Sequence, residues 1–314
     1  MVTGSGQRFT PYGVNLTLLR KVNGGYRSSV TAQQAEEHAA VTGWCANLVR
    51  IFAEQEELIV HGQVNRPYLA ALETSISRAE AGGLAVVLTL DQDALYAPRL
   101  PVQSTLLAWQ ALASRYGHDP QVIFDIFNEP SGNWPLWRDG GRYGGRVYYG
   151  MERVAQLIRA NGGHNLLWVQ GHHRGGNLRG IPRWRLSGVG PLAYDEHRPP
   201  APHTAASWTH SFGFLTTRYH YAVVEGEWAD YSRAAAGWAC WSDAPVSVHQ
   251  FLDYLAQHQI GLVAFDLSRP WLLRSASLTD PNQIRGNWAC ANGLNQGAGR
   301  QIMTWFARSN RGRA

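Results

Sequence analysis

The chain has 314 residues and a mass of 34.8 kDa, which suits one large domain of about 250 residues with insertions. Hydrophobic residues make up 45% of the chain and charged residues 16%, which excludes global disorder. The formal net charge is +5, but the arginines are dispersed along the sequence. No apolar run approaches the roughly 18 residues of a membrane span. We therefore expect neither a nucleic-acid partner nor a membrane partner.

Eight short apolar runs alternate with longer helical patterns along the chain. Most of these runs lack a strict polar–apolar alternation, as is typical of parallel strands that are covered on both faces. The expected strands are Tyr12–Leu16, Ala46–Phe52, Ala85–Leu90, Val122–Phe127, Leu166–Gln170, Leu192–Asp195, Tyr221–Gly226 and Gly261–Asp266.

Most segments between these strands have helical periodicity, whereas Gly171–Gly190 reads as a loop. The expected helices are Thr31–Thr42, Asn65–Ala81, Gln103–Tyr116, Tyr143–Ala160, Ser207–Thr216, Ser247–His258 and Arg300–Ser309. This order predicts an α/β fold, a single (β/α)8 TIM barrel with residues 1–314 as one domain. Chemistry on such a barrel gathers at the C-terminal ends of the strands.

Two glutamates follow strands of the expected barrel. Asn128-Glu129-Pro130 ends the fourth strand, and we expect the proline to hold Glu129 in a β or polyproline II conformation. Gly226-Glu227-Trp228 ends the seventh strand, with Trp228 expected as a wall of the site. Two carboxylates that face each other roughly 5–5.5 Å apart are what a retaining glycosidase needs, one as nucleophile and one as acid/base.

Glu225 is a rival nucleophile, two residues before Glu227 in the sequence. An ideal strand places Glu225 and Glu227 on the same face, with Glu225 one layer deeper in the barrel. A sugar does not reach that layer, so we favour Glu227.

The segments around Glu129 and Glu227 resemble glycoside hydrolase family 5, the cellulase-like branch of clan A, and the resemblance spans nearly the whole chain. It implies that Glu129 is the acid/base, that Glu227 is the nucleophile and that Asn128 donates a hydrogen bond to the sugar 2-hydroxyl. It also implies that Arg50, on the second strand, lies near the nucleophile. A buried guanidinium there is expected to keep Glu227 ionised.

Other positions match the family pattern in part. Tyr194 and His197 resemble its Tyr-x-x-His stretch, which makes His197 a neighbour of the substrate or of Glu227. The family often has a tyrosine two positions after that histidine, where this chain has Pro199, so either Tyr194 or Tyr221 is left to fill that role.

Two further strand ends depart from the family. Asp91 stands where relatives often have a histidine, which changes the polarity of the subsite beside the cleaved bond. Phe265 stands near the position of a tryptophan platform, with Asp266 adding a hydrogen-bonding acid. Several tryptophans in expected loops are candidates either for sugar stacking or for loop packing; they are Trp134, Trp137, Trp184, Trp238, Trp241 and Trp271.

The sequence offers little for other chemistries. The adjacent His172 and His173 have no carboxylate at a metal-ligand interval, and neither a nucleotide-binding nor a Gly-x-Ser-x-Gly motif follows a strand. We expect a monomer that hydrolyses a β-linked oligosaccharide, polysaccharide or glycoside with retention, without metal or cofactor. The alternatives are a catalytically silent carbohydrate-binding barrel and a transglycosylase on the same scaffold.

The three cysteines bear on localisation. Cys240 and Cys290 lie in tryptophan-flanked loops after the seventh and eighth strands, and we expect a disulfide between them and a buried free thiol at Cys45. Such a bridge fits a secreted enzyme, whereas three reduced cysteines would fit a cytoplasmic one. Residues 1–6 lack the blocks of a signal peptide, and we expect the signal peptide to be missing from a trimmed start.

Overall fold

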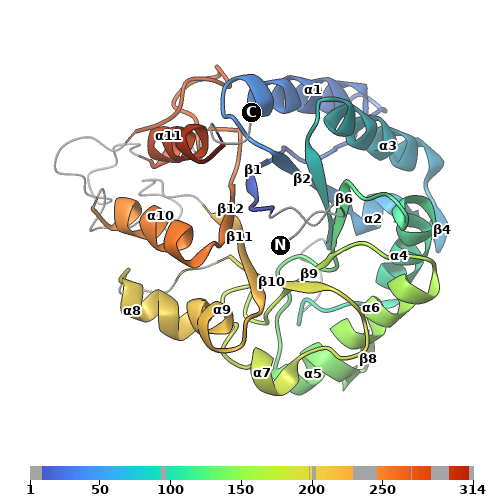
Figure 1. Cartoon of the computed structure of the whole chain (residues 1–314). Coiled ribbons are helices and arrows are strands. Elements are labelled where there is room, and N and C mark those ends of the chain that lie inside the picture. The colour runs from blue at the N-terminus through green and yellow to red at the C-terminus, as the bar shows by residue number, and fades with distance from the viewer. Residues whose placement is uncertain are drawn as a thin grey trace.

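Eight parallel strands close into a barrel, and helices form a ring around it (Figure 1). The computed structural model describes residues 9–92, 97–197, 199, 203–228, 246–269, 271–283 and 297–310. The barrel strands are β1 (Tyr12–Asn15), β2 (Leu48–Glu54), β5 (Ala85–Asp91), β6 (Val122–Asp125), β9 (Leu167–Gln170), β10 (Leu192–Glu196), β11 (Ala222–Trp228) and β12 (Gly261–Ala264). All eight expected strands are present, and the expected (β/α)8 barrel is confirmed.

The longer helices that cover the barrel lie between these strands in the chain, except the last one, which follows β12. They are α1 (Arg27–Thr42), α3 (Arg66–Ala81), α4 (Gln103–Tyr116), α6 (Met151–Ala160), α10 (Val246–His258) and α11 (Gly299–Asn310). Shorter elements are α2 (Gln55–Leu58), α5 (Trp134–Asp139), α7 (Ile181–Trp184), α8 (Ala205–Trp208), the π-helix η1 (Thr209–Gly213) and α9 (Phe214–Arg218). Among the described residues, no helix is both long and apolar enough to cross a membrane.

The expected helix over 143–160 begins only at Met151, so its first part was predicted wrongly. A hairpin of β7 (Gly140–Tyr143) and β8 (Arg146–Tyr149) occupies that part. Its two turn residues, Gly144 and Gly145, both have positive φ, at 55° and 78°. A two-residue hairpin turn of this kind requires that conformation, which glycine adopts without steric cost. A second, two-stranded hairpin joins β3 (Ile59–Val60) to β4 (Gln63–Val64).

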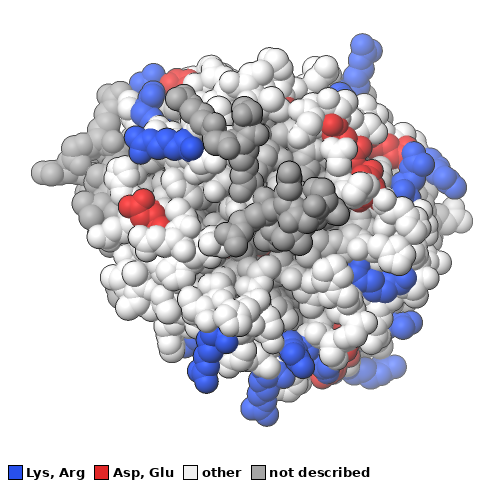
Figure 2. Space-filling model, in the orientation of Figure 1, with Lys and Arg blue, Asp and Glu red and all other residues white. Residues whose placement is uncertain are grey.

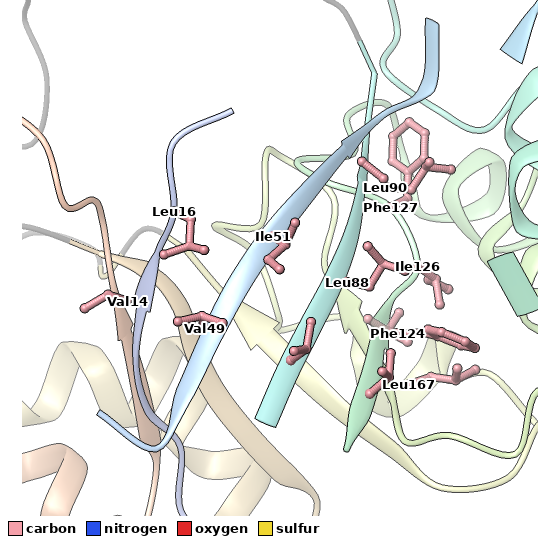
Figure 3. Close-up of a cluster of buried hydrophobic side chains, with 14 of the residues drawn as sticks. Val14, Leu16, Val49, Ile51, Leu88, Leu90, Phe124, Ile126, Phe127 and Leu167 are labelled. Atoms are coloured by element: carbon pink, nitrogen blue, oxygen red, sulfur yellow. The ribbon is translucent and has the colours of Figure 1, made fainter. Parts of the chain in front are cut away.

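Apolar side chains pack on both sides of the barrel wall. Figure 3 shows part of the shell between strands and helices, where Val49, Ile51 and Leu88 lie on neighbouring strands. The next residues along each strand point inward. They form a separate apolar cluster inside the barrel, made of Leu48, Val87, Ile123, Trp168, Ala193, Val224 and Val263. Because apolar side chains fill the interior, the site lies at the mouth of the barrel.

The surface charges agree with the dispersal of arginine in the sequence. On the face shown in Figure 2, Lys and Arg side chains are spread around the rim rather than gathered in one patch.

Candidate active site

A layer of polar side chains lies one step above the apolar cluster inside the barrel. Moving two residues along a strand leads from Leu48 to Arg50 on β2, and from Ile123 to Asp125 on β6. The same step reaches the remaining members of the layer, which are Asn15, Thr89, Gln170 and Asp195. All six are at most 1% exposed. Because they are buried, their hydrogen bonds must be made to one another or to the groups above them.

Arg50 is the centre of this layer. Its Nη1 lies 2.9 Å from both Asn15 Oδ1 and Glu227 Oε2. Its Nη2 lies 2.8 Å from Asp125 Oδ2 and 2.7 Å from Asn128 Oδ1, and its Nε donates to Thr89 Oγ1 at 3.0 Å. The guanidinium thus has a partner for each of its five N–H groups.

The charge of Arg50 is stabilised by its neighbours. Burial lowers the pKa of Arg50, but Asp125, Glu227 and Asp195 outweigh it and raise that pKa above the ordinary value. Arg50 therefore presents a fixed positive charge beneath the cleft.

A β-bulge on β11 directs Glu227 into the mouth of the barrel. Glu225 pairs with Leu262 on β12, whereas Trp228 pairs with Ala264, so β11 has one residue more than its partner over this stretch. Gly226 faces inward, since a Cβ there would lie 2.3 Å from both carboxylate oxygens of Asp195. Because of the extra residue, the side chain of Glu227 also points inward, toward the mouth of the barrel.

The bulge overturns the expectation that Glu225 and Glu227 share a face. Val224 belongs to the interior cluster, so the alternation of the strand places Glu225 on the helix side with Val223. Burial raises the pKa of Glu225 well above its ordinary value, and Glu196 beside it adds to the rise. Glu225 therefore does not lie beneath Glu227 in the barrel interior.

Glu129 enters the site from the loop after β6. Its backbone has a φ of +48°, in the left-handed region, which contradicts the expectation that Pro130 holds it in a β or polyproline II conformation. The Glu129 N–H donates to Gln170 Oε1 at 2.7 Å, which holds the backbone in this unusual conformation. Arg174 Nη1 lies 3.8 Å from Glu129 Oε2.

Glu129, His197 and Glu227 converge. One oxygen of each carboxylate and one ring nitrogen of His197 lie within 4.8 Å of one another, and in the described part of the chain this is the one group of three side chains with metal-ligand spacing. Arg50 donates to the same Glu227, at 2.9 Å, and its positive charge opposes a cation at this place. The arrangement suits two carboxyl groups that act on a substrate between them.

His197 connects two acids. Its Nε2 lies 3.2 Å from Asp195 Oδ2 and its Nδ1 lies 3.5 Å from Glu227 Oε2. Burial lowers the pKa of His197, but Asp195 and Glu227 outweigh it and raise that pKa above its ordinary value. A protonated imidazole beside Glu227 is thereby favoured.

The pKa of Glu227 follows from opposing effects. Burial raises this pKa, and His197 and Arg50 lower it without cancelling the rise. The expectation that Arg50 keeps Glu227 ionised is therefore met only in part, because removal of the carboxylate from water outweighs the attraction to the guanidinium.

Asn128 lies between Arg50 and Asp91. Its Nδ2 donates to Asp91 Oδ1 at 3.1 Å, and Arg99 Nη2 donates to the same oxygen at 2.7 Å. Asp91 thus joins the network from the end of β5.

The expected aromatic residues divide into two groups. Trp228 is 2% exposed and packs on Phe251 of α10, with 4.8 Å between ring centroids, so it lies in the outer shell and does not form a wall of the cleft. Tyr194 also lies in the outer shell, against Tyr221, because it alternates with the inward-facing Asp195. Neither tyrosine therefore takes the role left open by Pro199.

Phe265 and Trp134 remain partly accessible. Phe265, just after β12, packs edge to face with Trp271 at 5.1 Å. Trp134, at the start of α5, packs against Trp137 and His172, at 5.0 and 4.6 Å.

Several residues of the network were missed from the sequence. Asn15, Thr89, Asp125, Gln170 and Asp195 are inward-facing polar residues on strands. Each of them lies two residues after another inward-facing residue of the same strand. This period of two is the signal that could have revealed them. Arg99 and Arg174 come from loops and carry no such signal.

The disulfide expected between Cys240 and Cys290 lies outside the described residues, and so do the candidate tryptophans Trp238 and Trp241. Cys45 is a free thiol as expected, but it is half-buried rather than buried.

The fold resembles that of known glucanases. The β-glucanase SdGluc5_26A from Saccharophagus degradans matches with a TM-score of 0.72 at 16% identity, over 98% of this chain and 90% of that chain. The hyperthermophilic endocellulase from the archaeon Pyrococcus horikoshii matches with a TM-score of 0.67 at 16% identity, over 97% of this chain and 94% of that chain. XacCel5A in complex with cellopentaose has a TM-score of 0.64 at 16% identity, over 94% and 99% of the two chains.

Sequence comparisons give the family. No curated protein sequence matches the chain. The family profile described as Cellulase (glycosyl hydrolase family 5) matches residues 3–288, which is most of the chain. The protein is therefore a glycoside hydrolase and belongs to the cellulase family, glycosyl hydrolase family 5.

Proposed function

We propose that the chain hydrolyses a β-glycosidic bond with retention of configuration, with Glu227 as nucleophile and Glu129 as acid/base. The observation that carries the proposal is the approach of the two carboxylates, whose nearer oxygens lie within 4.8 Å of each other. Double displacement uses a separation of roughly 5–5.5 Å between carboxyl groups, whereas direct displacement by water needs about 6.5–9.5 Å.

The environments of the two glutamates suit different roles. Glu227 contacts the cationic Arg50 at 2.9 Å and His197 at 3.5 Å, which stabilise a carboxylate nucleophile. Glu129 lies across the cleft from Glu227, and Arg174 Nη1 is 3.8 Å from its Oε2. We infer that Glu129 acts as the acid/base, which gives and takes the proton during the reaction.

The reaction then proceeds in two steps. A carboxylate oxygen of Glu227 attacks the anomeric carbon, the bond from that carbon to the leaving oxygen breaks, and Glu129 gives its proton to the leaving oxygen. A covalent glycosyl-enzyme ester results. In the second step Glu129 takes a proton from water, the water oxygen attacks the anomeric carbon, and the bond to Glu227 breaks.

Other residues prepare this chemistry. We propose that Arg50 and His197 hold the Glu227 carboxylate, and that Asn128 donates to the sugar 2-hydroxyl. Phe265 is proposed to stack on a sugar ring, beside Trp271, and Trp134 to line the approach to the cleft.

The proposed substrate is a β-linked oligosaccharide, polysaccharide or glycoside. The structures with a similar fold include a β-glucanase, an endocellulase and a complex with cellopentaose, which supports a β-glucan as the first substrate to test. Transglycosylation uses the same ester with a sugar acceptor in place of water. A carbohydrate-binding barrel without activity is disfavoured, because binding alone does not need two opposed carboxyl groups.

We also propose that residues 1–314 act as a single catalytic domain, that the protein is a monomer, and that it is secreted with a disulfide between Cys240 and Cys290. Thiol titration of the denatured protein without reductant tests the bridge. One reactive thiol, from Cys45, supports it, and three reactive thiols would remove both the bridge and the main argument for secretion.

The roles of the glutamates are tested with Glu227→Gln, Glu129→Gln and the control Glu225→Gln on aryl β-glycosides. We expect the first two variants to lose at least about a hundredfold in kcat. We expect Glu225→Gln to retain turnover, since Glu225 lies on the helix side of β11. Full activity of Glu227→Gln or of Glu129→Gln would reject the assignment.

A further inference from the structure

Asp91 occupies a position at the end of β5 from which it contacts the amide of Asn128. We propose that Asp91, held by Arg99, is a positioning residue that gives the Asn128 amide one orientation and aims its second N–H at the substrate. This inference rests on the proposed function, and it adds two residues to the machinery of the reaction.

The amide oxygen of Asn128 is fully used. Oδ1 accepts from Arg50 Nη2 at 2.7 Å and from Gln170 Nε2 at 3.3 Å, which occupies both lone pairs. Arg50 is itself immobile, because it is buried and bonded to Asp125 at 2.8 Å. The oxygen end of the amide is therefore fixed from below.

The nitrogen end is fixed by Asp91. Asn128 Nδ2 donates one of its two hydrogens to Asp91 Oδ1 at 3.1 Å. A carboxylate accepts and a guanidinium donates, so Asp91 on one side and Arg50 on the other allow a single orientation of the amide. Since Asn128 is only 6% exposed, a reversed amide would leave buried groups facing each other without a hydrogen bond.

Arg99 keeps Asp91 in place. Its Nη2 lies 2.7 Å from Asp91 Oδ1, and the two side chains are only 13% and 19% exposed. The Asp91–Arg99 pair is also joined to the segment that follows Glu129. The Arg99 N–H donates to Ser131 Oγ at 2.7 Å, and the Ser131 N–H donates to Arg99 O at 2.8 Å.

The backbone completes this connection. The Asn128 N–H donates to Leu90 O at 2.9 Å, so the residue before Asp91 and the residue before Glu129 are joined directly. The second hydrogen of Asn128 Nδ2 is then the one hydrogen-bonding position of this amide that no described residue fills. A sugar hydroxyl above it, next to the reacting carbon, is the partner that the proposed reaction supplies.

The test compares two aryl β-glycosides that differ only in the 2-hydroxyl. For each, kcat and KM are measured with the wild type, Asp91→Leu and the surface control Asp253→Leu. A 2-deoxy sugar cannot use the Asn128 N–H, so it serves as an internal reference for every variant. The variant-to-wild-type ratio on each substrate removes the intrinsic difference in reactivity between the two sugars.

We expect Asp91→Leu, which has no acceptor for the Asn128 N–H, to lower kcat on the 2-hydroxy substrate by about ten- to a hundredfold, with little change in KM, because a misplaced donor mainly weakens the transition state. On the 2-deoxy substrate its loss should be less than about threefold. Arg99→Gln, which leaves Asp91 without its ion-pair partner, should show the same substrate-dependent loss and serves as the second variant where Asp91→Leu does not fold. Asp253→Leu should match the wild type on both.

Equal losses on the two substrates would overturn the proposal, as they would mean that Asp91 acts on folding or on another part of the sugar. No loss on either substrate would overturn it as well. Failure of the proposed function would give a different result. Either the wild type would show no turnover, or Glu227→Gln would keep full activity.

Discussion

Arg50 Nη1 and Glu227 Oε2 lie 2.9 Å apart although 177 residues separate them in the chain. The contact joins barrel strands two and seven, and it exists because β11 carries an extra residue before Trp228. A polar layer beneath the cleft thereby touches the proposed nucleophile directly.

Arg50→Lys should therefore be damaging in two ways. A lysine cannot donate in the directions of Asp125, Asn128 and Glu227 together, so buried acceptors lose their partners. We expect kcat to fall at least about a hundredfold and the free energy of unfolding to fall by about 3–5 kcal/mol. Steady-state kinetics and urea unfolding measure the two effects. Arg218→Lys, an exposed position on α9, is the matched control.

Removing His197 should shift the pH dependence. The proposed reaction needs Glu227 ionised, so the acid side of the kcat/KM profile should follow its pKa. Burial raises that pKa and His197 opposes the rise, so His197→Asn should let the pKa of Glu227 rise further. The acid limb should then move to higher pH. A limb that stays in place or moves to lower pH would contradict this account of the His197–Glu227 contact.

Glu36 should make the fold less stable as pH rises. Its carboxylate accepts from Thr17 N and Oγ1, at 2.8 and 2.9 Å, yet burial raises the pKa of Glu36 from 4.5 to about 7. The folded state therefore binds the proton more tightly than the unfolded state. Its contribution to stability is fully present below pH 4.5 and is lost between pH 4.5 and about 7.

Urea unfolding at pH 5 and pH 8 checks this effect. The wild type should lose stability relative to Glu36→Gln as the pH rises, by at most about 1.4 kcal/mol per pH unit. A constant difference between the two proteins would show that Glu36 titrates normally.

Gly226→Ala should disturb the site from beneath. A methyl group there would lie 2.3 Å from both carboxylate oxygens of Asp195, so either the bulge or Asp195 must move. We expect a loss of kcat of at least about tenfold together with a lower melting temperature. Gly25→Ala is the control, because a Cβ at Gly25 meets nothing within 4 Å. Equal behaviour of the two variants would argue against the bulge as the source of the Glu227 position.

Much of the site could be predicted from strand ends. Glu129, Glu227 and His197 lie at or just beyond strand ends, and the barrel gathers such residues at one mouth. Arg50 lies inside β2 and was predicted from the resemblance to the family. The orientation of Glu227 could not be predicted, because a bulge depends on how β11 pairs with β12 and on the space that Gly226 leaves for Asp195.

The expectations for two aromatic residues were wrong for a related reason. Trp228 and Tyr194 stand beside catalytic candidates in the sequence, but neighbouring residues on a strand point to opposite faces, and both belong to the outer shell. The hairpin of β7 and β8 was missed because its aromatic and arginine residues also fit a helical pattern. The antiparallel pairing of β7 with β8 and the positive φ of Gly144 and Gly145 distinguish the hairpin from a helix.

The stereochemistry of the first product tests the central claim most directly. Proton NMR during hydrolysis of an aryl β-glycoside, recorded before the free sugar mutarotates, reports which anomer is released. Two opposed carboxylates whose nearer oxygens lie within 4.8 Å predict the β-anomer first, with the α-anomer growing in only afterwards. Release of the α-anomer first would contradict double displacement and the assignment of Glu227 as nucleophile.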